Sequence, residues 1–225
     1  MRKTRERLME IYDLMFTHFG PRHWWPGETP FEVIVGAILT QSVSWANVEK
    51  AIKNLKDLDI LDPHGILDAP DEVLENAVRS TRYYKQKAVK LRSFCRVLTD
   101  EFDGDLGKMF ALNLNQLRDK LLSIKGVGPE TADSIILYAA EKPIFVVDAY
   151  TRRIFSRLGF FSENISYEDM QAFFMKHLQP DVQFYNEYHA QIDGIGHFFC
   201  SNTRAKCSEC PLSEKCGGIN QILKI

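Results

Sequence analysis

The chain has 225 residues, of which 45% are hydrophobic and 12% aromatic, and its formal net charge at pH 7 is −2. These values indicate a compact protein of one or two domains and exclude a low-complexity tail or scaffold. No segment is apolar over the length that a bilayer span needs, and acidic residues interrupt the basic N-terminal stretch where a signal-peptide core would lie, so we expect a cytoplasmic protein. A net charge near zero also argues against a strongly basic nucleic-acid binder.

Most of the chain has the pattern of helices joined by short turns that carry Pro, Gly or Asp, and no segment alternates convincingly like a strand. We therefore expect an all-α fold. Helices are predicted to begin near Thr4, Pro30, Ser44, Asp71, Lys85, Asn115, Glu130, Ala149, Tyr167 and Phe184. A turn is predicted at 61–65.

The three tryptophans lie in two places, Trp24 and Trp25 in a His-Trp-Trp-Pro segment and Trp45 at the start of a predicted helix. Core packing is the more common role of tryptophan when composition alone is considered. The alternative is a set of flat apolar walls for a planar ligand. Cys95, beside Phe94 in a helical stretch, is most simply a buried structural thiol.

The charged residues are unevenly distributed along the chain. One basic group comprises Arg79, Arg82, Lys85 and Lys87, and another comprises Arg152, Arg153 and Arg157. Four acidic residues gather in one predicted loop, namely Asp100, Glu101, Asp103 and Asp105. Local fields can therefore differ in sign from the net charge, so binding of a polyanion stays open.

A glycine hairpin between two predicted helices is the next feature in the chain. Apolar residues recur at helical spacing at Leu114, Leu117, Leu121 and Ile124. Gly126 and Gly128 then break this helix, and a second helix is predicted to resume over 131–140. Glycines permit a tight turn that exposes backbone N–H groups at a helix N-terminus, where a phosphate oxygen binds favourably. An ordinary turn between packed helices is the alternative, and it is the more frequent one for a G-x-G alone.

An apolar run at 144–147 ends abruptly at Asp148, directly before another predicted helix. The carboxylate is therefore expected at the rim of a buried element. Asp is a preferred N-cap residue, so capping is its simplest role. A carboxylate that caps a helix can also take part in catalysis.

Four cysteines near the C-terminus, Cys200, Cys207, Cys210 and Cys216, are separated by six, two and five residues. This spacing predicts a metal site, and a four-thiolate set suits either zinc or an iron–sulfur cluster. Disulfides are a third reading, but they are rare in a cytosolic protein.

The hairpin followed by Val-Val-Asp at 146–148 resembles the helix-hairpin-helix (HhH-GPD) DNA glycosylases of the endonuclease III superfamily. The resemblance covers nearly the whole chain, and the cysteine spacing matches the [4Fe-4S] loop of endonuclease III. It implies a six-helix barrel at 30–142 and a second helical domain at 1–29 plus 143–225, which would carry the catalytic Asp and the cluster. It also implies a monomer that acts on double-stranded DNA with a damaged base.

The same resemblance assigns roles to individual residues. Asp148 matches the catalytic carboxylate, and Gln41, in Gly-Ala-Ile-Leu-Thr-Gln, matches a residue that enters the duplex beside the extruded nucleotide. The candidate DNA contacts are Gln41, Lys125, Gly126, Gly128 and Arg152. The candidate cluster ligands are Cys200, Cys207, Cys210 and Cys216.

One position departs from the bifunctional members of the superfamily. They carry a nucleophilic Lys two residues after the second glycine, where this chain has Glu130. A lysine amine forms the Schiff base that permits strand cleavage, and a carboxylate does not. We therefore expect a monofunctional glycosylase, in which Glu130 either supports the site or adds a favourable carboxylate to the first turn of its helix.

The excised base is expected to be an alkylated purine. The hairpin sequence, the Trp-Trp-Pro segment and an aromatic residue at position 45 resemble the 3-methyladenine branch, in which aromatic side chains sandwich the base, so Trp24, Trp25 and Trp45 are candidate pocket residues. A cationic alkylated purine gains from a π face and leaves readily. Two alternatives remain, an endonuclease III-like enzyme for oxidised, mismatched or deaminated pyrimidines, and a non-catalytic iron–sulfur module that binds DNA.

Overall fold

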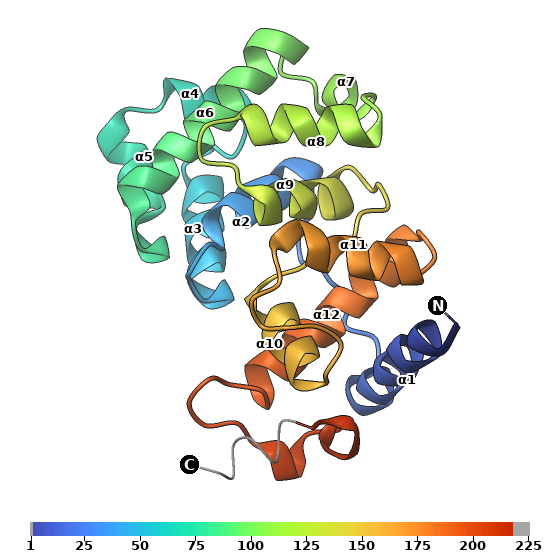
Figure 1. Ribbon diagram of the computed structural model, residues 1–225. Helices are drawn as coiled ribbons and strands as arrows, with labels where there is room; N and C mark the ends of the chain where they lie inside the picture. The colour runs from blue at the N-terminus through green and yellow to red at the C-terminus, as the bar shows by residue number, and fades with distance from the viewer. Residues whose placement is uncertain (1, 218–225) are drawn as a thin grey trace. The chain divides into compact units, whose positions relative to one another are not determined.

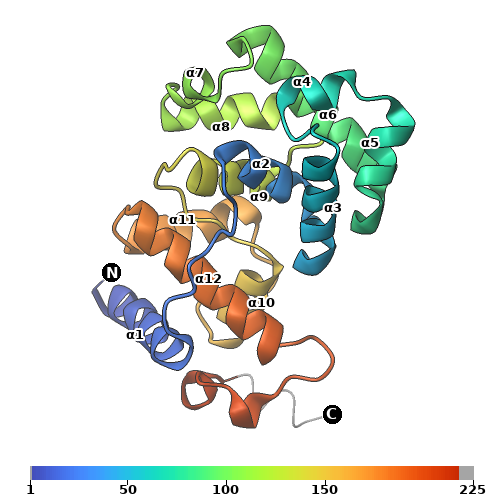
Figure 2. The same ribbon diagram turned by 180° about the vertical axis from the view of Figure 1, so that it is seen from behind.

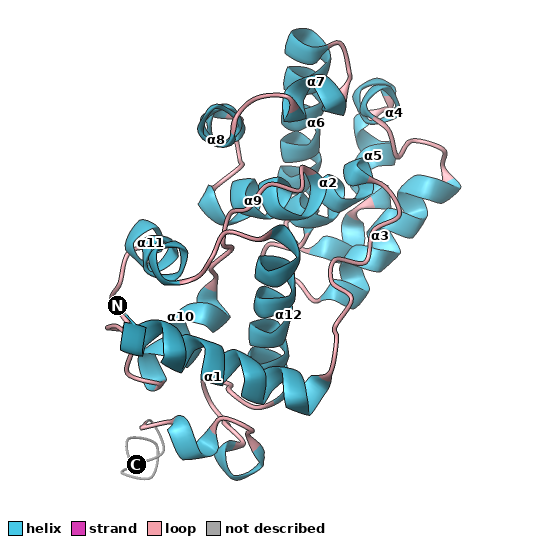
Figure 3. Cartoon of the chain, turned by 90° about the vertical axis from the view of Figure 1, so that its right-hand side faces the viewer, coloured by secondary structure: helices cyan, strands magenta, loops and turns pink. Residues whose placement is uncertain are grey.

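A computed structural model describes residues 2–217, and these residues form helices and loops without any strand (Figure 3). The all-α prediction is confirmed. Within this part of the chain no helix combines the length and the apolar character of a membrane span. The structure divides into two compact units, one of residues 25–142 and one of residues 1–24 plus 143–225. Each unit is described by itself.

The unit at 25–142 is built around one buried helix, α2 (Pro30–Leu39), which contacts α3, α6, α9 and η2 (Figure 1). Every residue of α2 from Phe31 to Leu39 is buried. Thr29 begins the helix, because its hydroxyl accepts a hydrogen bond from the N–H of Glu32 and Pro30 fills the first helical position. The other elements of this unit are α3 (Trp45–Asp57), α4 (Pro63–Asp68), α5 (Asp71–Ala77), η1 (Arg79–Thr81), α6 (Tyr84–Phe102), α7 (Leu106–Phe110), α8 (Leu114–Ser123), α9 (Pro129–Ser134) and η2 (Ile135–Ala139).

In the other unit, α12 (Val182–Phe198) packs against α1 (Arg2–Phe19) and α10 (Ala149–Arg157) (Figure 2). The core of this unit is aromatic. Phe145 stacks on Phe174 with ring centroids 4.4 Å apart, and the buried Tyr188 donates its hydroxyl to the carbonyl of Leu8 at 2.7 Å. The remaining elements are α11 (Tyr167–His177), η3 (Cys207–Glu209) and η4 (Ser213–Lys215).

The helix starts agree with the sequence prediction, with the largest offsets at Thr4 against Arg2 and Phe184 against Val182. The turn predicted at 61–65 is wrong in its second half, because Asp62 caps α4 and Pro63 begins it. The predicted second hairpin helix at 131–140 is divided, since α9 ends at Ser134 and continues as the π-helical turn η2.

Two predicted charge groups also differ from the structure. Asp100 and Glu101 lie in the last turn of α6 and not in a loop. Lys87 is buried, so it does not belong to an exposed basic patch. Cys95, by contrast, is buried as predicted, and burial raises the pKa of its thiol to about 12.

Candidate functional site

The glycine hairpin joins α8 to α9, and Gly126 makes its sharpest turn. Gly126 has φ +92°, a conformation that L side chains rarely adopt. A Cβ on this residue would also overlap the side-chain stem of Lys90 on α6. The N–H of Val127 closes the turn by donating to the carbonyl of Ile124 at 3.0 Å. Gly126 is therefore required by the fold itself.

Gly128 differs from Gly126 because its backbone does not require glycine. Its φ of −96° and ψ of 177° are open to any residue, and a Cβ would meet no atom within 4 Å. Gly128 is the N-cap of α9, so the missing side chain leaves the start of that helix open to a ligand. Lys125, just before the turn, is exposed. The predicted contacts Lys125, Gly126 and Gly128 thus lie together on the hairpin.

Gln41 lies two residues beyond α2 and is anchored to the hairpin helix. Its amide nitrogen donates to the hydroxyl of Thr131 on α9 at 2.7 Å, and its oxygen accepts a hydrogen bond from the ammonium of Lys90 at 2.5 Å. Gln41 therefore joins three elements of the unit that are far apart in the sequence. Lys87, one turn before Lys90, donates to the carbonyls of Leu39 and Thr81, and this holds the end of α2 in place.

Trp25 and Trp45 pack edge to face with ring centroids 5.2 Å apart, and Tyr138 lies 5.1 Å from Trp25. All three rings belong to the unit at 25–142, and both tryptophans approach Gly36 of α2 closely, at 3.2–3.4 Å from a Cβ placed there. Both tryptophans are partly exposed. Trp24 is also partly exposed and belongs to the other unit. Of the three candidate pocket residues, Trp25 and Trp45 lie together in one unit.

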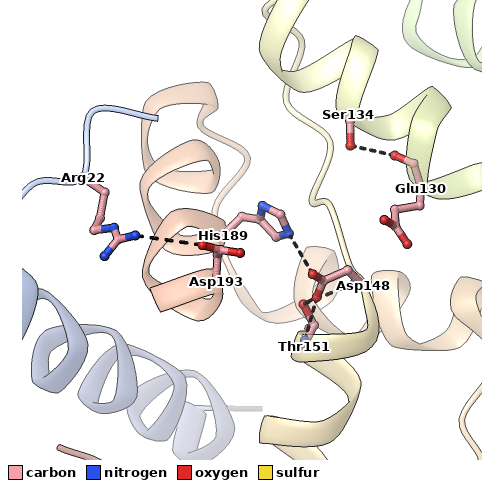
Figure 4. A network of polar contacts seen from close by, with 7 residues as sticks. All are labelled: Arg22, Glu130, Ser134, Asp148, Thr151, His189 and Asp193. Carbon is pink, nitrogen blue, oxygen red and sulfur yellow. Dashed lines mark hydrogen bonds and ion pairs between the residues drawn. The ribbon is translucent and has the colours of Figure 1, made fainter. Parts of the chain in front are cut away.

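Asp148 is the N-cap of α10, as its position in the sequence predicted (Figure 4). One carboxylate oxygen, Oδ1, accepts hydrogen bonds from the N–H and the hydroxyl of Thr151, both at 2.7 Å. The other oxygen, Oδ2, faces the Nε2 of His189 on α12 at 3.9 Å. The side chain is 18% exposed, so this carboxylate is oriented by fixed partners in a largely buried position.

A second carboxylate lies near Asp148. Asp193, one turn after His189 on α12, is paired with the guanidinium of Arg22 at 3.9 Å (Figure 4). Burial raises the pKa of Asp193, and the charge of Asp148 raises it further, whereas His189 and Arg22 act in the opposite direction. The electrostatic surroundings of Asp148 therefore include an imidazole and a second carboxylate.

Glu130 is exposed and lies in the first turn of α9, where an acidic side chain interacts favourably with the helix dipole. It belongs to a different unit from Asp148. Its backbone carbonyl accepts a hydrogen bond from the hydroxyl of Ser134 at 2.7 Å. Position 130 therefore presents a carboxylate directly after the hairpin.

The three arginines of α10 differ in their hydrogen-bond partners. Arg153 donates to the carbonyl of Cys200 at 2.6 Å, and Arg157 donates to the sulfur of Cys200 at 3.2 Å. Arg152 is partly exposed, and its Nε is buried without a hydrogen-bond partner in the described structure. Arg152 thus makes neither of the contacts to Cys200 that its two neighbours make, and its role as a DNA contact stays a prediction.

All four cysteines after α12 line one cavity of about 30 Å³, and Arg157, Phe199 and Ser213 complete its wall. Burial, together with the neighbouring thiols Cys200, Cys216 and Cys207, raises the pKa of Cys210 to about 11. Among residues 2–217 no group of three or more His, Cys, Asp or Glu side chains is arranged to hold a metal ion. A four-thiolate cage is a donor set that suits an iron–sulfur cluster.

Sequence reasoning missed Lys90 and His189, and it misplaced Lys87. Each of these residues contacts a partner that is distant in the chain. Lys90 contacts Gln41, His189 faces Asp148, and Lys87 contacts the end of α2. A lysine on the apolar face of a helix was the one available signal, since Lys87 is followed by Ala88 and Leu91, which are also buried.

Two named proteins resemble this chain over most of its length. A Methanocaldococcus jannaschii protein provisionally named as a DNA repair glycosylase is 43% identical over 213 residues, which cover 94% of this chain and 96% of that protein. Endonuclease III of Thermotoga maritima is 27% identical over 187 residues, which cover 83% of this chain and 82% of the relative.

Solved structures show the same architecture. An endonuclease III trapped in a covalent intermediate with DNA has a TM-score of 0.83 and 26% identity, covering 97% of this chain and 98% of that one. The Helicobacter pylori 3-methyladenine DNA glycosylase MagIII, bound to 1,N6-ethenoadenine, has a TM-score of 0.71 and 28% identity, covering 86% and 95%. The family model for the HhH-GPD superfamily matches residues 35–180, which include the hairpin, Glu130 and Asp148. The chain belongs to the HhH-GPD superfamily of base excision DNA repair proteins and is a DNA glycosylase of that family.

Proposed function

We propose that this chain is a monofunctional DNA glycosylase that hydrolyses the N-glycosidic bond of alkylated purines, with 3-methyladenine as the type substrate, in double-stranded DNA. Two observations carry the proposal: Asp148 is an oriented carboxylate, and position 130, directly after the hairpin, holds a carboxylate and not an amine. The first suits stabilisation of a cationic transition state. The second supports hydrolysis without a Schiff base. The protein acts as a monomer in the cytoplasm.

The reaction breaks the bond between C1′ of the sugar and the ring nitrogen of the base. As the base departs with the bonding electron pair, the sugar acquires oxocarbenium character, and the negative charge of Asp148 stabilises it. A water molecule then forms a bond from its oxygen to C1′, and its proton passes to solvent. The products are a free base and an abasic site. Because Thr151 fixes one oxygen of Asp148, the carboxylate needs little reorganisation during this step.

The choice of an alkylated purine rests on the aromatic rings of the unit at 25–142. Trp25 and Trp45 are partly exposed, and Trp25 packs against the buried Tyr138. The partly exposed indole rings offer the π faces that a cationic base prefers. Trp24, which precedes Trp25 in the sequence, is proposed as a further residue that contacts the base. The Helicobacter pylori relative, a 3-methyladenine DNA glycosylase bound to an ethenoadenine, supports this choice.

A [4Fe-4S] cluster is proposed for the cavity lined by Cys200, Cys207, Cys210 and Cys216. The cluster would bind the C-terminal loop to α10 and α12, a structural role, because ligation of thiolates contributes directly to folding. Arg157 would donate a hydrogen bond to one of its sulfur ligands. The guanidinium therefore belongs to the surroundings of the cluster and not to the DNA interface.

An endonuclease III-like substrate range is the second candidate. Endonuclease III has the higher structural similarity of the two solved relatives, with a TM-score of 0.83 against 0.71. Such an enzyme would release oxidised, mismatched or deaminated pyrimidines. A duplex with one thymine glycol or one uracil, offered beside an alkylated duplex, separates the two ranges by the base that appears in solution. A non-catalytic DNA-binding module would release none of them.

The test compares the wild-type protein with Asp148→Asn on an alkylated duplex. Asn keeps the N-cap of α10, because its side-chain oxygen also accepts a hydrogen bond from the N–H of Thr151. We therefore expect unchanged thermal stability and DNA affinity but a loss of base release of about 10²- to 10³-fold. Release of 3-methyladenine by the wild type alone supports the proposal. Equal release by both proteins would exclude Asp148 as the catalytic carboxylate.

A further inference from the structure

A buried histidine lies against the proposed catalytic carboxylate, although the reaction as described above does not use it. The Nε2 of His189 is 3.9 Å from the Oδ2 of Asp148, and the residue is 8% exposed (Figure 4). The Nε2 atom itself exposes less than 1 Å². Because this atom is shielded from solvent and faces Asp148, we expect His189 to act on the reaction through that carboxylate.

The two oxygens of Asp148 are in different surroundings. Oδ1 is held by two hydrogen bonds from Thr151, which fix the plane of the carboxylate. Oδ2 faces His189 at a distance that suits an ion pair when the imidazole is protonated but is too long for a hydrogen bond. The charge of the imidazole therefore changes the field at Oδ2 without displacing the cap.

Other charged groups surround the imidazole. Asp193 is buried on the same helix, and its carboxylate responds to the charges of both His189 and Asp148. Arg22, from the segment after α1, pairs with Asp193 at 3.9 Å. The titratable and charged groups that face this cluster are Asp148, Tyr150 and Arg153 from α10, Glu187, Asp193 and His197 from α12, and Arg22.

We propose that His189 is a positioning residue that sets the effective negative charge of Asp148. A protonated imidazole partly cancels the electrostatic field of the carboxylate, and a neutral imidazole leaves that field at full strength. This inference rests on the proposed function. The negative charge of Asp148 acts on the sugar cation, and an imidazolium at 3.9 Å from Oδ2 opposes that action. Imidazole is the side chain whose charge changes between about pH 5 and pH 8. Base release should therefore increase as the pH rises through that range.

The first test does not depend on any enzymatic activity. The ring signals of His189 are followed by NMR against pH in the wild type and in Asp148→Asn. Because Asp148 lies 3.9 Å from the imidazole, removing its charge should change how the His189 ring signals depend on pH. An unchanged midpoint would show that the two groups are not coupled and would overturn the proposal.

The second test is a pH profile of single-turnover base release from an alkylated duplex. The wild-type rate should rise by up to about tenfold between about pH 5 and pH 8. His189→Gln, which is always neutral, should give a flat profile, and His189→Asn serves if the first variant does not fold. His177→Gln on α11 is the matched control and should keep the wild-type profile. Parallel profiles in wild type and His189→Gln, or a wild-type rate that falls with pH, would contradict the proposal.

The two tests also separate this inference from the proposed function. If the wild type releases no base from any lesion, the glycosylase proposal fails, while the NMR titration still decides whether His189 and Asp148 are coupled. If the wild type releases base but its profile matches that of His189→Gln, the proposed function stands and the role of His189 is wrong.

Discussion

At the scale of single residues, the side chains of the site divide into those that the fold requires and those that it leaves open. Asp148 caps α10 and is oriented by Thr151, so its geometry is part of the helix. Glu130, by contrast, is exposed in the first turn of α9. Substitution of an exposed side chain usually changes the free energy of unfolding by less than about 0.5 kcal/mol.

A Glu130→Lys substitution tests the proposed absence of lyase chemistry. The new amine would stand where the bifunctional relatives carry their nucleophile, and it should form a Schiff base with the abasic sugar. We expect a covalent protein–DNA adduct after borohydride reduction in Glu130→Lys and none in the wild type. Glu130→Gln is the matched control and should form no adduct. An adduct with the wild-type protein would contradict the monofunctional assignment.

The burial of Lys87 predicts how the folding stability of the protein depends on pH. It is 2% exposed, and burial lowers its pKa to about 8, with Lys90 adding to the shift. Between about pH 8 and pH 10 the unfolded chain holds a proton at this residue that the folded protein lacks, so folding stability rises with pH. The neutral amine still has N–H groups to donate to Leu39 and Thr81.

The free energy of unfolding of the wild type, relative to Lys87→Met, should therefore increase by about 2–3 kcal/mol from pH 8 to pH 10. Denaturant unfolding at a series of pH values measures this difference, and the other titrating groups cancel because both proteins carry them. A constant difference across this range would show that Lys87 keeps its proton in the folded state.

At the scale of elements, the hairpin and the helices were foreseeable because their signals are local. Apolar spacing, Pro30 at the first position of α2 and Asp148 before α10 each act within a few residues. The long-range pairs were not foreseeable in this way. Gln41 meets Lys90 across 49 positions, and His189 reaches Asp148 from a separate helix. No local pattern encodes such contacts.

The two hairpin glycines provide an internal comparison. Gly126→Ala places a side chain at φ +92° and against Lys90, so it should lower the free energy of unfolding by about 1–2 kcal/mol. Gly128→Ala meets neither strain nor contact and should leave stability within about 0.5 kcal/mol of the wild type.

The effect of Gly128→Ala on DNA affinity should differ from its effect on stability. Because Gly128 lies open at the start of α9, an alanine methyl group there obstructs the approach of a phosphate, and we expect weaker binding to duplex DNA at unchanged stability. Fluorescence anisotropy with a labelled duplex measures this DNA affinity. Full affinity in Gly128→Ala would mean that this helix start does not contact DNA.

At the scale of the whole molecule, the chain combines an HhH-GPD scaffold with four cysteines that enclose one cavity. Protein that contains a [4Fe-4S] cluster should be brown with a broad absorption near ~400 nm, and a colourless protein loaded with zinc would contradict that assignment. Cys207→Ser should lower the yield of folded protein and its iron and sulfide content, because three thiolates hold the loop less well. Folded, cluster-free protein with full DNA binding would contradict the structural role.

The central claim is that this glycosylase releases alkylated purines by hydrolysis and leaves an abasic site uncut. The most direct test incubates the wild-type protein with an alkylated duplex, identifies the released bases by mass spectrometry, and compares strand cleavage before and after alkali. We predict release of 3-methyladenine with cleavage that depends on alkali. Release of pyrimidine lesions in place of alkylpurines would contradict the substrate assignment, and cleavage without alkali would contradict the hydrolytic mechanism inferred from Glu130.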